Sequence, residues 1–305
     1  MRGITGKCPH PRPLPAREGE KVLGRFSSIG CFEARRVCAR TKRDVIGVAK
    51  ILAVANQKGG VGKTTTSVNL CASLAAAKRR VLLVDLDPQG NATMGSGVEK
   101  SSLEASSYDV LLGEKTVRES WVLVDRGGYQ LLPSNSDLTA AEIALLDEIG
   151  RELRLRQALE QVRQEFDYII VDCPPSLGLL TVNALTAADS VLIPVQCEYY
   201  ALEGLSKLLN SIQLVQRYLN PTLEIEGVLL TMYDERLQLS KRVAAEVKSY
   251  FNDKVYETVI KRNVSLAAAP SFGQPVILYE PRSTGADNYR RLAGEVGHAQ
   301  EAALA

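Results

Sequence analysis

A glycine-rich stretch between a short apolar run and a helix-like run constrains the fold of this chain more than any other feature. It reads Gln57-Lys58-Gly59-Gly60-Val61-Gly62-Lys63-Thr64-Thr65 and follows the apolar run Ile51–Ala55. Glycines let the backbone curl so that successive N–H groups point at an anion, and the following helix adds its positive N-terminal end. Strand, glycine-rich turn and helix together predict a phosphate-binding loop. A glycine-rich turn with surface lysines is the alternative.

Two positions in this loop have specific chemical roles. Lys63 is placed for the β- and γ-phosphates of a nucleotide, and the Thr64 hydroxyl for Mg²⁺. The usual pattern G-x-x-x-x-G-K-[ST] requires glycine at position 57, where this chain has Gln57, followed by a second lysine, Lys58. The loop is therefore expected to bind phosphate with an unusual extra positive charge.

Carboxylates follow two other strand-like runs. Asp85 and Asp87 come after Val81–Val84, and Asp172 ends the run Tyr168–Val171. Side chains two residues apart on a strand point to the same face, so the first pair is expected to share one side. Near a phosphate loop, carboxylates hold a metal ion or orient attacking water. For Asp172 alone, a helix cap is an equally common role, but the upstream loop favours a metal role.

From Ile51 onward, apolar strand-like runs alternate with helical patterns, which predicts an α/β fold with a doubly wound, mostly parallel sheet and helices on both faces. The expected strands are 51–55, 81–84, 129–132, 168–171, 190–195 and 225–230, and the expected helices are 66–77, 138–146, 151–164, 200–218 and 239–250. Ligands of such sheets bind at the carboxyl ends of the strands. The phosphate loop and the carboxylates fall at those ends.

Composition limits the possible protein classes. The 305 residues are 45% hydrophobic and 24% charged, and no window of 18 residues is wholly apolar, so a membrane span is not expected. The six cysteines are scattered without a C-x-x-C pair, which favours reduced thiols over a metal site. Residues 1–50 hold 12 Lys and Arg against 4 Asp and Glu, and the remainder is acidic. Contact with nucleic acid by the remainder therefore needs a local basic patch.

Three segments are expected along the chain. Residues 1–48 are basic, rich in Arg, Pro and Gly and poor in apolar periodicity, so they are expected to be a disordered extension. A misassigned start site is the favoured explanation for this segment. A DNA-binding arm is an alternative. Residues 49–297 are expected to form one domain built around the phosphate loop, and residues 298–305 a C-terminal tail.

The spelling Lys58-Gly59-Gly60-Val61-Gly62-Lys63-Thr64-Thr65 resembles the deviant Walker A motif of the ParA/MinD family of P-loop ATPases. The run Asp85–Thr93 and the run Pro194–Gly204 narrow the resemblance to the ParA/Soj branch, over about residues 50–297. The resemblance implies a P-loop NTPase fold, the cofactors ATP and Mg²⁺, and a homodimer that sandwiches ATP. Lys58 corresponds to the family lysine that reaches the partner subunit's nucleotide.

The resemblance also implies a role for each matching residue. The catalytic residues would be Lys58, Lys63 and Asp87; the nucleotide-binding residues Lys58, Gly59, Gly60, Val61, Gly62, Lys63, Thr64, Thr65, Met232 and Arg262; the metal ligands Thr64 and Asp172; and the DNA-binding residue Arg236.

The chain departs from the branch after position 231. Ser265 stands where a second DNA-contacting arginine is expected, and Lys261 where a proline lies near the adenine pocket. Each lost phosphate contact weakens DNA binding. Lys261, Arg262, Lys241 and Arg242 are candidates for partial compensation, although solvated surface charge is the simpler reading for each.

The expected function is a cytoplasmic, nucleoid-associated Mg²⁺-dependent ATPase that dimerises on ATP, binds DNA non-specifically and drives chromosome or plasmid partition with a ParB-type stimulating protein. An orphan ATPase that positions a non-DNA cargo is the alternative. A MinD-like membrane switch is not expected, because residues 295–305 are Ala-rich, acidic and short of bulky apolar residues. An iron–sulfur carrier is not expected either, since Cys173 and Cys197 read as buried apolar thiols.

Overall fold

The computed structural model describes residues 48–198 and 201–304. Residues 1–47 lie outside this range, and so does the expected disordered extension. The described residues contain seven strands: β1 (Lys50–Val54), β2 (Val81–Asp85), β3 (Val122–Val124), β4 (Tyr129–Leu132), β5 (Tyr168–Asp172), β6 (Ser190–Gln196) and β7 (Glu224–Thr231).

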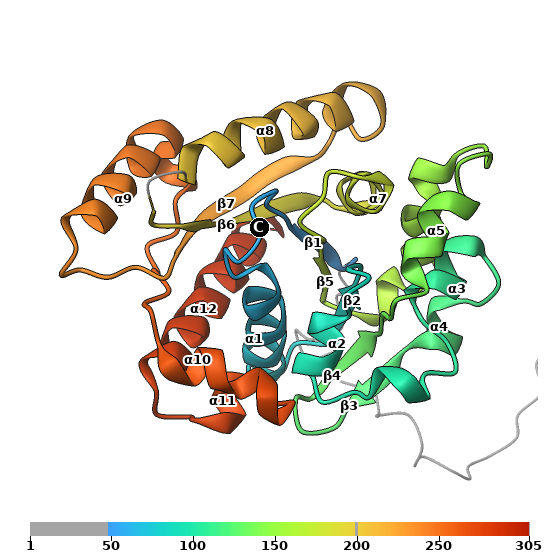
Figure 1. Ribbon diagram of the computed structural model, residues 1–305, viewed down its shortest axis with the longest axis horizontal. Coiled ribbons are helices and arrows are strands. Elements are labelled where there is room, and N and C mark those ends of the chain that lie inside the picture. Colours follow the sequence, from blue (N-terminus) through green and yellow to red (C-terminus); the bar gives the residue numbers. More distant parts are fainter. Residues whose placement is uncertain (1–47, 199–200, 305) are drawn as a thin grey trace, which may run out of the picture. The chain divides into compact units, whose positions relative to one another are not determined.

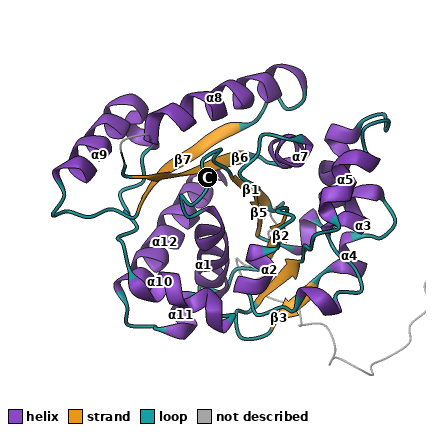
Figure 2. Ribbon diagram, in the orientation of Figure 1, coloured by secondary structure: helices purple, strands orange, loops and turns teal. Residues whose placement is uncertain are grey.

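The strands form one sheet in the order β3-β4-β2-β5-β1-β6-β7 (Figure 2). Every neighbouring pair is parallel except β3 and β4, which are antiparallel. Each of the six strands predicted from the sequence is present, within one residue at each end. Strand β3 was not predicted; its sequence Val-Leu-Val is apolar but shorter than the runs of four to eight residues that are typical of strands.

The helices within the described residues are α1 (Lys63–Ala76), α2 (Asn91–Gly95), α3 (Ser107–Leu112), α4 (Val117–Ser120), α5 (Leu138–Ala144), α6 (Arg154–Glu160), α7 (Leu179–Ala187), α8 (Ala201–Tyr218), α9 (Gln238–Phe251), α10 (Val264–Ala268), α11 (Val276–Tyr279) and α12 (Thr284–Leu304). Short 3-10 helices include η2 (Arg151–Leu153), η3 (Arg163–Glu165) and η5 (Ala269–Phe272).

Two apolar cores cover the two faces of the sheet. Alternate residues of β1 separate between them: Ile51 and Ala53 pack in the core with α6, α7 and α8, whereas Leu52 and Val54 pack in the core with α1 and α12. Figure 1 shows α1 and α12 side by side on one side of the sheet, with α7 on the other. The predicted doubly wound α/β fold is therefore confirmed.

The helices differ from the prediction in several places. The single helix expected over 151–164 is η2, α6 and η3 in succession. Helix α7 was not predicted, because its sequence LLTVNALTA is apolar on nearly all sides and gives no helical period. Residues 298–304, expected as a tail, continue α12.

Candidate functional site

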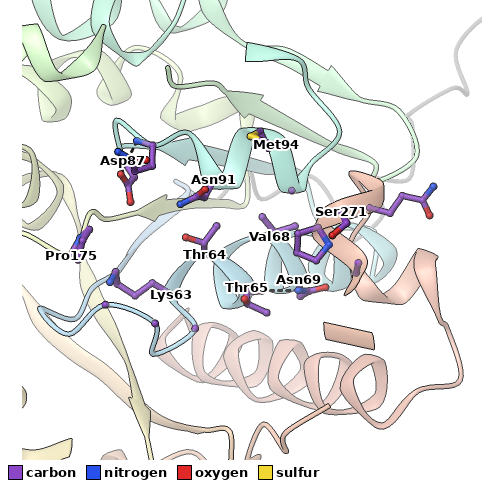
Figure 3. A pocket seen from close by; sticks show the side chains of 18 of the residues that line it. Lys63, Thr64, Thr65, Val68, Asn69, Asp87, Asn91, Met94, Pro175 and Ser271 are labelled. Atoms are coloured by element: carbon purple, nitrogen blue, oxygen red, sulfur yellow. Dashed lines mark hydrogen bonds between the residues drawn. The ribbon is translucent and has the colours of Figure 1, made fainter. Parts of the chain in front are cut away.

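The phosphate loop joins β1 to α1 through residues 55–62 (Figure 3). Gly60 and Gly62 have φ of +74° and +90°, values that side chains rarely adopt, and Gly62 caps the N-terminus of α1. Lys63 opens the helix and is only 7% exposed, with its Nζ donating to the Lys58 carbonyl at 3.3 Å. Burial lowers the pKa of Lys63, and the nearby Asp172 opposes this shift.

Two buried polar side chains, one in the loop and one on β7, fix the loop to the sheet. Asn56 donates through Nδ2 to the Pro194 carbonyl at 2.7 Å, and its Oδ1 accepts from the Lys58 backbone N–H at 3.0 Å. Thr231, at the end of β7, donates its hydroxyl to the Val61 carbonyl at 2.8 Å. The sequence reasoning missed both anchors. Their only signal is a polar side chain at a strand end, which many positions share.

Asp172 lies at the carboxyl end of β5, in register with Asp85 at the end of β2. Its two oxygens accept hydrogen bonds from the Thr64 and Ser67 hydroxyls, each at 2.8 Å. Burial raises the pKa of Asp172, the charge of Asp85 adds to the shift, and the two hydroxyls oppose it. Burial makes the ionised form of Asp172 unfavourable, and a nearby cation would stabilise that form. Ser67, one helical turn into α1, was not predicted.

Asp85 holds the loop that carries Asp87. One Asp85 oxygen accepts from the backbone N–H and the hydroxyl of Thr93 at 2.8 and 2.7 Å, and the other accepts from the Asp87 N–H at 3.2 Å. Asp87 is 7% exposed, and its Oδ1 accepts from the Gln89 N–H at 2.9 Å. The side chain of Asp87 lies at the wall of the pocket that Lys63 and Thr64 also line (Figure 3).

That pocket has a volume of about 580 Å³. It brings together most of the predicted nucleotide-binding residues: Gly59, Gly60, Gly62, Lys63, Thr64, Thr65 and Met232, with Asp87. Met232 has a φ of +50°, an unusual conformation for a side chain of its size. Residues that the sequence reasoning did not predict complete the lining: Val68, Asn69, Gln89, Asn91, Met94, Gly95, Pro175, Ala269, Pro270, Ser271 and Gln274. Most of them come from α1, α2 and η5, and Gln89, Pro175 and Gln274 come from loops; only the tertiary fold brings these segments together.

Four of the residues predicted to bind nucleotide or metal are not among those that line the pocket. Val61 is a buried residue of the loop, and Asp172 accepts a hydrogen bond from Thr64. Lys58 extends toward Glu198, with its Nζ 3.7 Å from one carboxylate oxygen. Arg262 approaches the other oxygen of Glu198 at 3.8 Å.

Arg236, the predicted DNA contact, lies on the surface beyond β7. Its side chain is 85% exposed and forms a two-pronged ion pair with Asp234, with N–O distances of 2.9 and 2.7 Å. Hydrogen bonds from Arg236 lower the pKa of Asp234 to about 2. The guanidinium is therefore neutralised by its neighbour in this structure, and DNA contact remains a prediction.

The remaining expectations concern thiols and membranes. Cys173 and Cys197 are buried free thiols, as predicted, and the described residues contain no group of three or more metal-binding side chains of the His, Cys, Asp or Glu type. Among the described helices, none is both long and apolar enough to cross a membrane.

Comparisons with known proteins agree with this geometry. The model of a family described as AAA domain matches residues 49–225. Over 249 residues the chain is 60% identical to the sporulation initiation inhibitor protein Soj of Bacillus subtilis, covering 82% of this chain and 98% of that protein. It is 51% identical to the chromosome partitioning protein ParA of Caulobacter vibrioides over 249 residues, 81% of this chain and 93% of that protein.

A solved structure shares both fold and sequence. The crystal structure of cobyrinic acid a,c-diamide synthase from Mycobacterium smegmatis, with bound ADP and magnesium, is 42% identical with a TM-score of 0.72. The match covers 81% of this chain and 93% of that chain. From the phosphate loop, the strand-end carboxylates and these identities, we conclude that the chain belongs to the ParA/Soj family of partition ATPases, within the ParA/MinD superfamily.

Proposed function

We propose that this protein is a cytoplasmic, nucleoid-associated Mg²⁺-dependent ATPase that forms an ATP-dependent homodimer, binds DNA without sequence preference and drives chromosome or plasmid partition with a ParB-type partner. One observation carries the dimerisation in this proposal. The two lysines of the loop have different surroundings: Lys63 lines the pocket, whereas Lys58 is not among the lining residues and pairs with Glu198. This arrangement supports a role for Lys63 on its own nucleotide and for Lys58 on the nucleotide of a second subunit.

The donor set under the pocket fits ATP with Mg²⁺. Thr64 and Asp172 present hard oxygen ligands 2.8 Å apart beside the phosphate loop, and Mg²⁺ prefers oxygen ligands. When bound, Mg²⁺ neutralises phosphate charge. Thr64 and Asp172 would hold it, while Lys63 and the loop N–H groups would bind the phosphates. The Mycobacterium smegmatis structure, which contains both ADP and magnesium, supports the binding of a nucleotide together with Mg²⁺.

Asp87 is the residue proposed to orient the attacking water. Its carboxylate lies at the pocket wall, and the Gln89 N–H together with the loop anchored by Asp85 restricts its position. Phosphoryl transfer to water depends mainly on positioning and charge neutralisation. A fixed carboxylate at this place suits that task.

The partition role rests on the two relatives described above, at 60 and 51% identity, which carry sporulation and partition names. The solved neighbour at 42% identity has a name that denotes a different reaction. A non-DNA cargo is the second candidate. Two observations favour it: the ion pair of Arg236 with Asp234, and Ser265 at the position of the second family arginine.

The test compares two lysine variants. We expect wild type with Mg²⁺ and a non-hydrolysable ATP analogue to sediment as a dimer. Lys58→Ala should bind the analogue but stay monomeric, because only the contact across the interface is lost. Lys63→Ala should lose nucleotide affinity itself. Titration calorimetry and analytical ultracentrifugation separate the two effects, and equal dimerisation of wild type and Lys58→Ala would contradict the sandwich dimer.

A further inference from the structure

Glu198 lies where two positively charged segments of the nucleotide site meet. It follows the end of β6, and its carboxylate has Lys58 Nζ at 3.7 Å on one oxygen and Arg262 Nη2 at 3.8 Å on the other. Gln196 donates from Nε2 to Glu198 at 2.5 Å. One carboxylate therefore joins a lysine of the phosphate loop to an arginine more than 200 positions later in the chain.

The ion pairs of Glu198 with Lys58 and Arg262 are weak enough to break and form again readily. The side chains of Lys58, Glu198 and Arg262 are 31%, 48% and 65% exposed. Ion pairs between exposed side chains contribute up to about 1 kcal/mol and are screened by salt. Such a pair biases where Lys58 lies without fixing it there.

The position of Lys58 matters because its ammonium group cannot contact Glu198 and the nucleotide of a partner subunit at the same time. On its own subunit it faces a carboxylate. Across a dimer interface it would face the phosphates of the partner subunit's nucleotide, which carry more negative charge. The cis ion pair and the trans contact therefore compete for the same lysine.

We propose that Glu198 is a positioning residue that holds Lys58 on its own subunit in the nucleotide-free monomer and so raises the threshold for ATP-dependent dimerisation. This inference rests on the proposed function, in which Lys58 acts in trans. Glu198 touches no nucleotide in this scheme. It acts through Lys58 and, by its second oxygen, through Arg262.

The test variant is Glu198→Gln, which keeps the size of the side chain and an oxygen that accepts from Gln196 but removes the charge. The dimer dissociation constant with Mg²⁺ and a non-hydrolysable ATP analogue should fall about 4- to 25-fold, because each of the two subunits gives up one exposed ion pair that accounts for about two- to fivefold. The difference should shrink as salt is raised from 50 to 500 mM.

The matched control is Glu235→Gln. Glu235 is also exposed and pairs with a lysine, Lys261, at 3.2 Å, so the variant makes the same change in net charge nearby. It should leave the dimer dissociation constant unchanged. An equal effect of both variants would mean that net charge, and not the Lys58 pair, controls dimerisation, and would overturn the proposal.

A second measurement reads the ion pair without any dimer. The acylation rate of Lys58 in nucleotide-free protein, followed by mass spectrometry with Lys241 as internal reference, should rise in Glu198→Gln. An unchanged rate, or weaker dimerisation of Glu198→Gln, would overturn the inference. Failure of wild type to dimerise with the ATP analogue would instead contradict the proposed function, and the acylation rate would still report on the pair.

Discussion

The residues that hold the phosphate loop differ in how readily the sequence reveals them. Gly62, Lys63 and Thr64 occur in a fixed local pattern, so the pattern predicts them. Asn56, at the start of the loop, bonds to the carbonyl of Pro194 in β6. Thr231, in β7, bonds to the carbonyl of Val61 in the loop, and both partners are distant in sequence. No local pattern encodes such contacts, because they exist only once β1, β6 and β7 lie side by side.

The Thr231 anchor leads to a prediction on stability. Thr231→Val keeps the shape of the side chain but removes the donor to the Val61 carbonyl, leaving that carbonyl without this partner. The free energy of unfolding should fall by about 1 kcal/mol, and nucleotide affinity should fall with it. Urea unfolding and titration calorimetry measure the two effects. Thr231→Ser retains the hydroxyl and serves as control; equal losses in both variants would contradict a role for this hydrogen bond.

Asp87 allows the chemical step to be separated from binding. Asp87→Asn keeps an oxygen that accepts from the Gln89 N–H but removes the charge proposed to orient water. Hydrolysis should slow by about 10²-fold or more, while ATP binding and dimerisation persist. Asp125→Asn, at an exposed turn, should leave the rate unchanged. A normal rate in Asp87→Asn would assign water activation to another group.

At the scale of elements, predictability follows from the strength of the apolar pattern. The buried parallel strands β1, β2 and β5 are continuous apolar runs, so the sequence predicts them well. Helix α12 was not among the predicted helices, because Gly285, Gly294 and Gly297 lower its helix propensity, although its buried apolar residues do recur at helical spacing. The structure shows why the helix matters: Tyr289, Leu292 and Val296 are buried in the core that α12 shares with α1.

This contact makes α12 a support for the helix that begins at the phosphate loop. Leu292→Ala removes a fully buried side chain and should lower the free energy of unfolding by about 2–5 kcal/mol. Leu214→Ala, at a 56% exposed position of α8, should change it by less than about 0.5 kcal/mol. Urea unfolding of the two variants measures the difference. A loss of unfolding free energy for Leu292→Ala as small as that expected for Leu214→Ala would mean that packing of α12 does not stabilise the domain.

At the scale of the whole molecule, charge separates the chain into two regions. Residues 1–50 carry a strong positive excess, and the rest is acidic overall. Non-specific DNA binding depends on positive charge near phosphates. The proposed DNA affinity would therefore come from a local patch such as Arg236 or from the basic N-terminal region, and the two sources are separable by experiment.

Because Arg236 forms an ion pair with Asp234, substitutions of these two residues are expected to change DNA binding in opposite directions. In dimers held by Asp87→Ala, Arg236→Glu should weaken DNA binding and reduce its salt dependence, because a phosphate contact is lost. Asp234→Asn should strengthen DNA binding, since it frees the guanidinium from its neutralising partner. Fluorescence anisotropy on a non-specific duplex across a salt series measures both changes.

Deleting residues 1–47 from the same dimers provides the complementary measurement. The pocket residues all lie between Gly59 and Gln274, so ATP binding should be unchanged by the deletion. If Arg236 is the main DNA contact, the truncated dimer should retain most of its affinity and still respond to Arg236→Glu and Asp234→Asn in opposite directions. If neither substitution changes the affinity while the deletion abolishes it, DNA binds the basic N-terminal region instead. The size of the Asp234→Asn effect decides between these outcomes. A general loss of negative charge strengthens DNA binding by the amount seen for Asp253→Asn, an exposed control, whereas a DNA contact at Arg236 makes the gain from Asp234→Asn larger than that.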